Sequence, residues 1–231
     1  MIGIICAMDA EIEAFIKELK DSVKEEYCKV VFYKGKLYNQ DCVVVKGGYG
    51  KADSARTTTL LIEHFPVNHV FNIGLGGGNG KYVTKHSFVI ADKIAYHDVD
   101  LISDGRFKYG QMQTYPLFFE ADKETIDKIT SLYKDVVVGG ILSGDSFASN
   151  QSWINDRLKY FESYEGFKPC VFDMEGASIS QICYRLNVKF NIIRYVSDIV
   201  ESTNQIDTYF ESKKDSSYIL IDIIKTYLTN I

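Results

Sequence analysis

The sequence predicts an α/β fold, a single domain of three layers in which helices cover both faces of a mixed, largely parallel central sheet. Short apolar runs alternate along the 231 residues with segments of helical periodicity. Several of these runs are apolar at successive positions, which is typical of strands that are buried on both faces. Because neither an internal repeat nor a Pro/Gly/Ser-rich linker interrupts the pattern, we expect one domain that spans residues 1–231.

In the first half of the chain, the apolar run at 2–7 predicts a buried strand. Asp9 follows it as the expected N-cap of a helix whose apolar face is formed by positions 12, 15, 16 and 19. Further strands are expected at 30–38, 42–45, 70–73 and 87–96, and a helix at 52–64. The glycine-rich segment 74–78 follows the strand at 70–73, and we expect it to form a loop.

In the second half, an irregular polar stretch to about 116 precedes a helix at 122–133 and a strand at 136–142. A short strand at 171–172 leads into a helix at 174–186, whose inner face is expected to consist of Ile179, Ile182, Cys183 and Leu186. An apolar strand at 190–196 follows. The pattern ends in a helix with four apolar residues on one face: Leu220, Ile223, Ile224 and Tyr227.

Composition excludes several classes of protein. The net charge of −5 is unfavourable for nucleic-acid binding, which needs clustered Lys and Arg. Five cysteines without a C-x-x-C pair argue against a disulfide framework and a structural zinc site, and they favour a reducing compartment. The apolar N-terminus lacks the features of a signal peptide, and no apolar run approaches the ~20 residues of a membrane span. We therefore expect a cytoplasmic protein without nucleic-acid or membrane partners.

The glycine-rich segment matches neither common nucleotide-binding motif. Asn79 stands where the dinucleotide motif has Gly, and the segment after it has the pattern of a strand. Tyr82 stands where a phosphate loop has Ser or Thr. His97 has no second histidine nearby, so the His-Asp cluster at 97–100 favours a structural role over a metal site. We expect no metal and no cofactor, and we interpret the glycines as a place where backbone approaches a ligand closely.

Acidic residues follow three of the expected strands. Glu11 comes after the strand at 2–7, Glu175 after the strand at 171–172, and Asp198 after the strand at 190–196. Ligands bind beyond the carboxyl ends of strands in such sheets, so we expect these acids on one rim. A single strand-end acid is most simply a helix cap, and Asp9 and Asp173 are interpreted in that way. Three acids gathered beside a glycine-rich segment favour a functional site.

Seven segments, in order along the chain, resemble the bacterial methylthioadenosine/adenosylhomocysteine nucleosidases. They are IGIICAMDAEIE at 2–13, YGK at 49–51, NIGLGGG at 72–78, YHDVD at 96–100, SGDSF at 143–147, DMEGA at 173–177 and RYVSD at 194–198. The last two segments are shared with nucleoside phosphorylases, whereas the acid-rich one at 8–13 is more specific to the hydrolases. The resemblance implies a nucleoside phosphorylase-like fold, a homodimer, and cleavage of adenine from a 5′-thio-substituted adenosine by water.

The resemblance also implies roles for individual residues. Asp198 is expected to protonate adenine N7, and Glu11 to bind and deprotonate the attacking water. Glu175 is expected to hold the ribose hydroxyls, with Met174 packed beneath the sugar. The other expected substrate-binding positions are Gly77 in the glycine-rich segment, Phe147 stacked on adenine, the backbone of Ala148 at the base edge, and Arg194 and Ser197, which orient the carboxylates.

Two carboxyl groups fit the chemistry of this reaction. Cleavage builds positive charge on the ribose, which a buried carboxylate stabilises, as in glycoside hydrolysis. One carboxyl must stay protonated at neutral pH, and burial favours that form. The alternative is a purine nucleoside phosphorylase, which would hold phosphate with arginines. None of the five arginines lies in the first strand–helix turn, where Glu11 stands, so water is favoured as the nucleophile.

Two departures from the family pattern lie at the expected site. Leu75 replaces the usual Ser of the glycine-rich segment, and Ala148 replaces a larger aliphatic residue. These changes motivate a second alternative, a protein that binds nucleosides without consuming them. Retention of all three carboxylates favours an enzyme, because a binding protein needs no matched acid and base.

The loop at 101–116 is one residue longer than is usual in the family, where it borders the 5′ substituent across a dimer interface. It carries Asp104 and Arg106, and we hypothesise that this charged pair contacts the tail of an adenosylhomocysteine substrate. The sequence leaves open the preferred 5′ substituent, futalosine-type substrates and 5′-deoxyadenosine included. It also leaves open whether Tyr209 or Phe210 covers that substituent.

Overall fold

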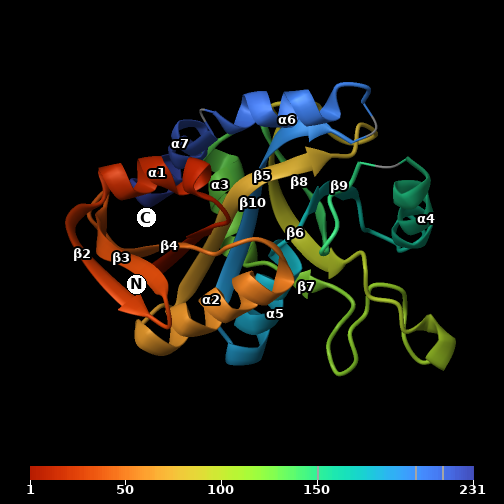
Figure 1. The fold of residues 1–231 in the computed structure, drawn as a ribbon, viewed down its shortest axis with the longest axis horizontal. Helices are drawn as coiled ribbons and strands as arrows, with labels where there is room; N and C mark the ends of the chain where they lie inside the picture. Colours follow the sequence, from red (N-terminus) through yellow and green to blue (C-terminus); the bar gives the residue numbers. More distant parts are fainter. Residues whose placement is uncertain (150, 201, 215) are drawn as a thin grey trace.

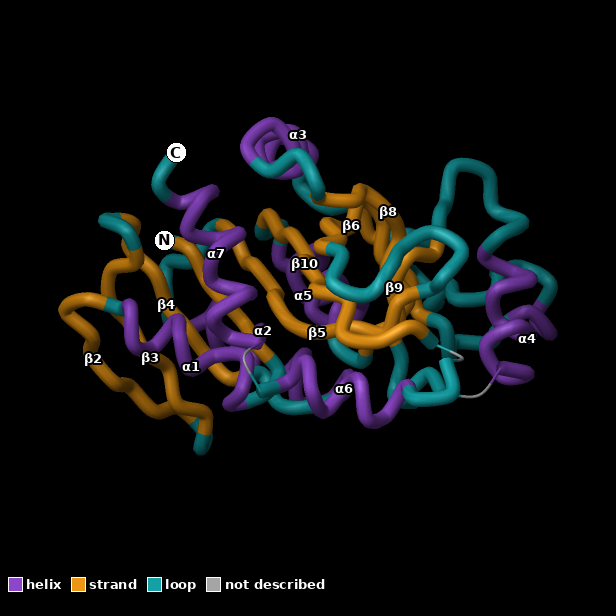
Figure 2. The backbone as a smooth tube through the Cα atoms, turned by 90° about the horizontal axis from the view of Figure 1, so that it is seen from above, coloured by secondary structure: helices purple, strands orange, loops and turns teal. Residues whose placement is uncertain are grey.

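The structure, a computed structural model, describes residues 1–149, 151–200, 202–214 and 216–231. The ten strands that it describes belong to one sheet, and helices pack on both faces of that sheet (Figure 1, Figure 2). The predicted three-layer α/β architecture with a mixed sheet is therefore confirmed. Within the described part of the chain, no helix is long and apolar enough to cross a membrane.

The order of the strands in the sheet differs from their order in the chain. In the sheet they run β10-β6-β8-β9-β5-β1-β4-β3-β2, with β7 paired to β6. Strands β4, β1, β5 and β10 are parallel neighbours, as are β6, β8 and β9, whereas the outer strands β2 and β3 add in antiparallel fashion. The strand bounds are β1 (Ile2–Cys6), β2 (Lys20–Tyr27), β3 (Val30–Leu37), β4 (Gln40–Lys46), β5 (His69–Gly78), β6 (Phe88–Tyr96), β7 (Phe119–Glu120), β8 (Val136–Ser143), β9 (Pro169–Asp173) and β10 (Lys189–Ile199).

The sheet also closes on itself, because β5 pairs with both β10 and β9 and thereby completes the ring β5-β10-β6-β8-β9. Glycine makes this closure sterically feasible: a Cβ on Gly76 would lie 2.4 Å from a Val171 methyl, and one on Gly78 2.6 Å from a Val196 methyl. The prediction of a loop at 74–78 is therefore wrong. This segment is the last part of β5 and pairs along its length with β10.

The helices cover two large apolar cores, one on each face of the sheet, and a third, smaller apolar cluster includes residues of α4. Alternate residues of β1 point to opposite faces, so Ile4 joins the core under α1, α3 and α7, and Ile5 joins the core under α2 and α5. All four residues predicted for the inner face of the C-terminal helix are buried. The helix bounds are α1 (Asp9–Glu18), α2 (Gly50–His64), α3 (Lys123–Leu132), α4 (Gln151–Phe161), α5 (Gly176–Leu186), α6 (Gln205–Lys213) and α7 (Ser216–Leu228).

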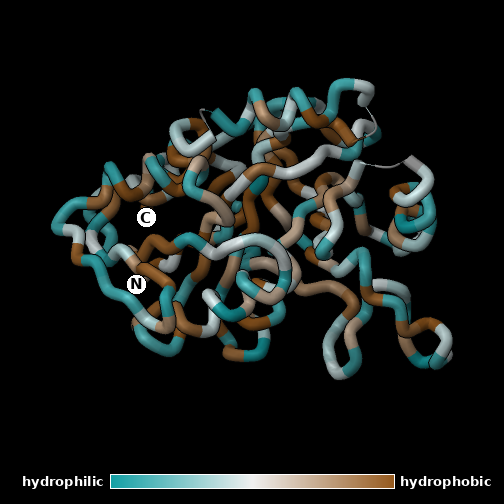
Figure 3. Tube along the Cα trace, in the orientation of Figure 1, coloured by the Kyte–Doolittle hydropathy of each residue, from teal (hydrophilic) through white to brown (hydrophobic). Residues whose placement is uncertain are grey.

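Several sequence predictions of local structure need correction. Strands β2 and β7 and helices α4 and α6 were not predicted. The sequence does not predict β2 because the charged residues of this strand lie at the outer edge of the sheet and give no apolar pattern (Figure 3). Met8, not Asp9, is the N-cap of α1, and Asp9 is its first residue. Leu186 does not belong to the inner face of α5, since it stands at the end of the helix and is 39% exposed.

Candidate active site

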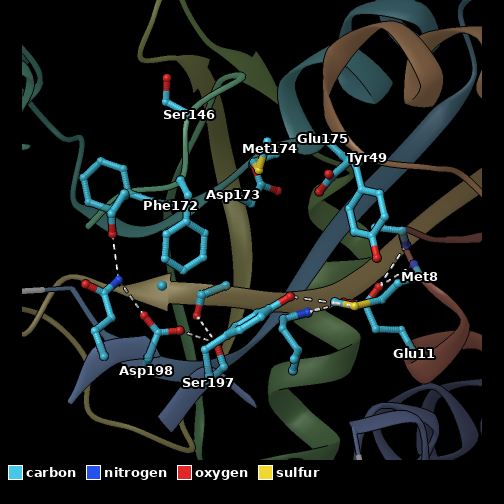
Figure 4. Close-up of a pocket in the computed structure, with 18 residues that line it drawn as sticks. Met8, Glu11, Tyr49, Ser146, Phe172, Asp173, Met174, Glu175, Ser197 and Asp198 are labelled. Carbon is cyan, nitrogen blue, oxygen red and sulfur yellow. Dashed lines mark hydrogen bonds between the residues drawn. The ribbon is translucent and has the colours of Figure 1, made fainter. Parts of the chain in front are cut away.

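A pocket lies where β1, β5, β9 and β10 end (Figure 4). Eight of the nine predicted site residues line it: Glu11, Gly77, Phe147, Ala148, Met174, Glu175, Ser197 and Asp198. The ninth, Arg194, is fully buried and contacts Asp173, which also lines the pocket. Residues from both ends of the chain meet here because β1 and β10 flank β5 in the sheet.

Glu11 is held by backbone N–H groups from two elements. Its Oε2 accepts hydrogen bonds from Ala7 (2.9 Å) and Met8 (3.2 Å), and its Oε1 accepts one from Leu75 in β5 (2.8 Å). Gly74 leaves the space for this carboxylate, since a Cβ there would lie 2.7 Å from Oε1. Burial raises the pKa of Glu11, while the backbone donors and Arg194 oppose the rise. The result is a fixed carboxylate with a stronger affinity for a proton than an exposed one.

Asp198 lies across the pocket from Glu11 (Figure 4), at an irregularity in the pairing of β10 with β5. The register shifts between Val196 and Asp198, so the strand accommodates Ser197 as an extra residue, and both Ser197 and Asp198 line the pocket. The Ser197 hydroxyl donates to Asp198 Oδ1 (2.5 Å), and Gln205 Nε2 donates to Oδ2 (2.8 Å). Burial raises the pKa of Asp198, and these two donors oppose the rise.

The segment between β9 and α5 supplies two more carboxylates. Asp173 accepts the N–H of Gly176 (3.1 Å), the first residue of α5, and it pairs with Arg194 Nη2 (2.5 Å); the N-cap of α5 is Glu175, not Asp173 as predicted. Arg194 also donates to Asn72 Oδ1 (2.5 Å), and its positive charge is balanced by the Asp173 carboxylate. Glu175 accepts the N–H of Gly50 (2.9 Å). Burial, reinforced by the negative charge of Asp173, raises the pKa of Glu175 to about 7.

Aromatic rings form the open side of the pocket. Phe147 is 47% exposed, and its ring meets the edge of Tyr209 from α6 at a centroid distance of 5.7 Å. The Tyr209 hydroxyl lies 3.8 Å from the sulfur of Met8 on the opposite wall. Phe210 is 57% exposed and does not line the pocket. Of the two C-terminal aromatic residues left open by the sequence, Tyr209 is therefore the one at the site.

Several residues that line the pocket had no predicted role, among them Tyr49, Phe172 and Gln205. Tyr49 lies in the segment YGK, to which the family resemblance assigns no role. Gln205 was missed because α6 was not predicted at all. The Gln205 side chain lies seven positions after Asp198 in the sequence, and no sequence pattern pairs the two. The two side chains meet because α6 follows β10 and packs beside its end.

Other charged groups singled out in the sequence lie outside the pocket. Arg106 pairs with Asp104 at the surface, and neither lines the pocket of its own chain, so the structure gives no support within one chain to a contact with the substrate tail. His97 is fully buried against the ring of Trp153, and burial lowers its pKa to about 4. No group of three or more metal-binding side chains occurs in the part of the chain that the structure describes.

Comparison with known proteins places this geometry in a family. The chain matches the phosphorylase superfamily over residues 1–226, and it belongs to that superfamily. It is 32% identical to the 5′-methylthioadenosine/S-adenosylhomocysteine nucleosidase of Oceanobacillus iheyensis, over 97% of this chain and 98% of the relative. Within the superfamily, the chain therefore belongs to the family of 5′-methylthioadenosine/S-adenosylhomocysteine nucleosidases, which are N-glycosyl hydrolases.

Solved structures agree with this placement. The S-adenosylhomocysteine nucleosidase of Streptococcus pyogenes, in complex with 5-methylthiotubericidin, superposes with a TM-score of 0.92 at 29% identity, covering 100% of this chain and 96% of that one. The nucleosidase of S. pneumoniae with the transition-state inhibitor MT-ImmA gives a TM-score of 0.91 at 30% identity, covering 99% and 98%. The expectation of a nucleoside phosphorylase-like fold is confirmed.

Proposed function

We propose that the protein hydrolyses the N-glycosidic bond of 5′-methylthioadenosine and of S-adenosylhomocysteine, releasing adenine and the thioribose product. The observation that carries this proposal is the pair of buried carboxyl groups, Glu11 and Asp198, on opposite sides of one pocket. Cleavage needs one group that gives a proton to the leaving base and another that takes a proton from water. The names and bound ligands of the relatives support the same reaction.

The charge of the pocket favours water over phosphate as the nucleophile. Among the described residues that line it, none is Lys or Arg, and the positive charge of Arg194 is balanced by Asp173. The carboxylates of Glu11 and Glu175 would repel a phosphate dianion, whereas an attacking water molecule carries no charge. This argues against the phosphorylase alternative.

Asp198 acts in this proposal as the general acid. Burial raises its pKa, which keeps a larger fraction of the acid form near neutral pH than an exposed aspartate has. A proton delivered to adenine N7 lets the base leave as a neutral molecule. Phe147 stacks on the purine, and the backbone of Ala148 meets its edge. Gly77 lies beside Asp198 where backbone packs closely, since a Cβ there would stand 2.9 Å from a Val200 methyl.

Glu11 acts as the general base and binds the attacking water on the ribose side. Its two oxygens are fixed by backbone donors, so little reorganisation is needed when it accepts the proton. Glu175 holds the ribose hydroxyls, and Met174 packs beneath the sugar. Arg194 acts indirectly: it is bonded to Asp173 and lowers the pKa of Glu11 through its charge. Ser197 orients Asp198 through its hydroxyl.

Release of free adenine, measured with and without inorganic phosphate, tests the proposal. We expect adenine and the free thioribose from both substrates at the same rate in either buffer. Strict dependence on phosphate, with a sugar phosphate as product, would establish the phosphorylase instead. Stoichiometric binding of methylthioadenosine without any adenine release would establish a nucleoside-binding protein.

We propose further that residues 1–231 act as one domain, that two copies form a homodimer, and that the enzyme works in the cytoplasm. One continuous sheet that brings Glu11 and Asp198 to the same pocket supports the first point. The family resemblance supports the second, and five free cysteine thiols, four of them buried, suit a reducing compartment. Sedimentation at micromolar concentration tests the dimer, and a monomer alone would contradict it.

A further inference from the structure

Helix α6 packs over the pocket, and the side chain of its first residue, Gln205, is buried there. Of the residues Gln205–Lys213, all of which the structure describes, Gln205 is buried. Ile206 and Phe210 are each 57% exposed. Further along the helix, Tyr209 contacts Phe147 and Met8, and the Ser212 hydroxyl donates to the Ser197 backbone oxygen (2.8 Å).

The side-chain amide of Gln205 donates both of its N–H bonds to the part of the pocket assigned above to the purine. Nε2 donates to the backbone oxygen of Ala148 (2.7 Å) and to Oδ2 of Asp198 (2.8 Å). The dashed lines in Figure 4 show hydrogen bonds that converge on the Asp198 carboxylate. Gln205 therefore satisfies two acceptors that the proposed function gives to the substrate.

An amide NH₂ group and the exocyclic amine of adenine present the same chemistry. Each is a planar nitrogen on an sp² carbon, with two N–H bonds that diverge within one plane. A 6-aminopurine that presents its N7 to Asp198 and its edge to the Ala148 backbone brings its amine toward these same two acceptors. The two acceptors are one carbonyl oxygen, from Ala148, and one carboxylate oxygen, from Asp198. The amide of Gln205 and the amine of the purine therefore compete for the same two oxygens.

We propose that Gln205 is an internal competitor of the purine: its amide occupies the place of the 6-amino group in the empty site, and the substrate must displace it. This inference rests on the proposed function, since it takes the Asp198 end of the pocket as the purine site. Displacement breaks the two hydrogen bonds that tie the start of α6 to Ala148 and Asp198, whereas the Ser212 hydroxyl and the Tyr209 ring keep the rest of the helix in place.

The competition also bears on the protonation of Asp198. Ser197 donates to one oxygen and Gln205 to the other, and both hydrogen bonds favour the anion against the burial that raises the pKa of Asp198. Withdrawal of the amide removes one of these donors, so the proton affinity of Oδ2 rises. Gln205 thus ties the acid form of Asp198 to arrival of the base.

The inference is tested by the affinity for adenine, measured by calorimetry. When a competing side chain is removed, the binding-competent fraction rises and the apparent Kd falls. We expect Gln205→Ala to bind adenine about tenfold more tightly than the wild type, which corresponds to ~1.4 kcal/mol. Gln205→Met, which keeps the bulk but has no N–H donor, should bind adenine more tightly as well. The matched control is Ile206→Ala on the exposed side of α6, which should leave the Kd unchanged.

A second ligand separates competition from a general loosening of the site. Methylthioribose fits only the sugar end of the pocket, so its affinity should be the same in the wild type and both Gln205 variants. Unchanged or weaker adenine binding by the folded variants would overturn the inference, because Gln205 would then be neutral or a partner of the bound purine. A wild type that neither binds adenine nor hydrolyses methylthioadenosine would instead refute the proposed function.

Discussion

Replacement of Asp198 by asparagine separates catalysis from stability at the acid end of the pocket. The two side chains have nearly the same shape, and Asp198 is 1% exposed. The amide oxygen of asparagine can accept from Ser197 or from Gln205, but its NH₂ group cannot accept from the other donor. The loss is therefore about one hydrogen bond, or ~1 kcal/mol, and the variant no longer buries an ionisable group. A fall in Tm of about 2–4 °C is expected at most.

The expected loss of activity is much larger than the loss of stability. An amide cannot give a proton to N7, and general acid catalysis of this kind contributes ~10²–10⁴-fold. This factor corresponds to about 3–5 kcal/mol of transition-state stabilisation, several times the expected cost to folding. We expect kcat for adenine release to fall by this factor while the circular dichroism spectrum stays that of the wild type. Asp135→Asn, at an exposed position between α3 and β8, is the matched control.

The pH dependence gives a second measure of the same role. A general acid works in its protonated form, so the wild-type kcat should fall as the pH rises through the raised pKa of Asp198. In Asp198→Asn the remaining activity should lack this alkaline decline. A variant that keeps a near-normal kcat, or that keeps the alkaline decline, would refute the assignment of the acid.

Three further substitutions probe the rest of the site. Glu11→Gln should lower kcat by ~10²–10⁴-fold and remove the decline of kcat at acidic pH, because the base must be deprotonated. Unchanged kinetics would exclude Glu11 as the base. Leu75→Ser should lower the free energy of unfolding by about 2–4 kcal/mol in urea titrations, since the Leu75 side chain is buried. The variant should keep kcat within tenfold of the wild type, because Glu11 is held by the backbone N–H of residue 75, which the substitution does not change. Arg106→Ala should leave the ratio of kcat/KM for the two substrates unchanged, because the guanidinium pairs with Asp104 outside the pocket of its own chain. A fall in kcat/KM for S-adenosylhomocysteine alone would show that Arg106 contacts the tail of this substrate.

The sequence predicted the fold well where burial leaves a periodic signal. The runs that became β1, β6 and β10 are rich in apolar residues, and the C-terminal helix has its four apolar residues on one face. Strand β2 has no such signal, because one edge of the sheet is solvent-exposed and tolerates lysine and glutamate. The closed ring was beyond prediction, since it depends on glycines packing against Val171 and Val196, which are distant in sequence.

The site was predictable to the extent that its residues follow strands. Glu11, Glu175 and Asp198 each come within a few residues of a strand end, and parallel strands bring such ends together. Gln205 and Tyr209 come instead from α6, whose sequence mixes polar and exposed apolar positions without an amphipathic stripe. Their place in the pocket follows from how this helix docks, which no local pattern in the chain records.

The hydrogen-bond donors around the two carboxyl groups explain why one is the base and the other the acid, although burial raises the pKa of both. Glu11 accepts three backbone N–H groups, which are fixed by β1, α1 and β5 and cannot turn away. Such donors stabilise the anion permanently, as a base that must start deprotonated requires. Among the residues that the structure describes, Asp198 accepts from two side chains, a hydroxyl that can rotate and an amide that can withdraw. Its anion is stabilised conditionally, so the acid form becomes accessible once the purine replaces Gln205. The difference between the base and the acid therefore arises from the mobility of the hydrogen-bond donors, since the two carboxyl groups are equally buried.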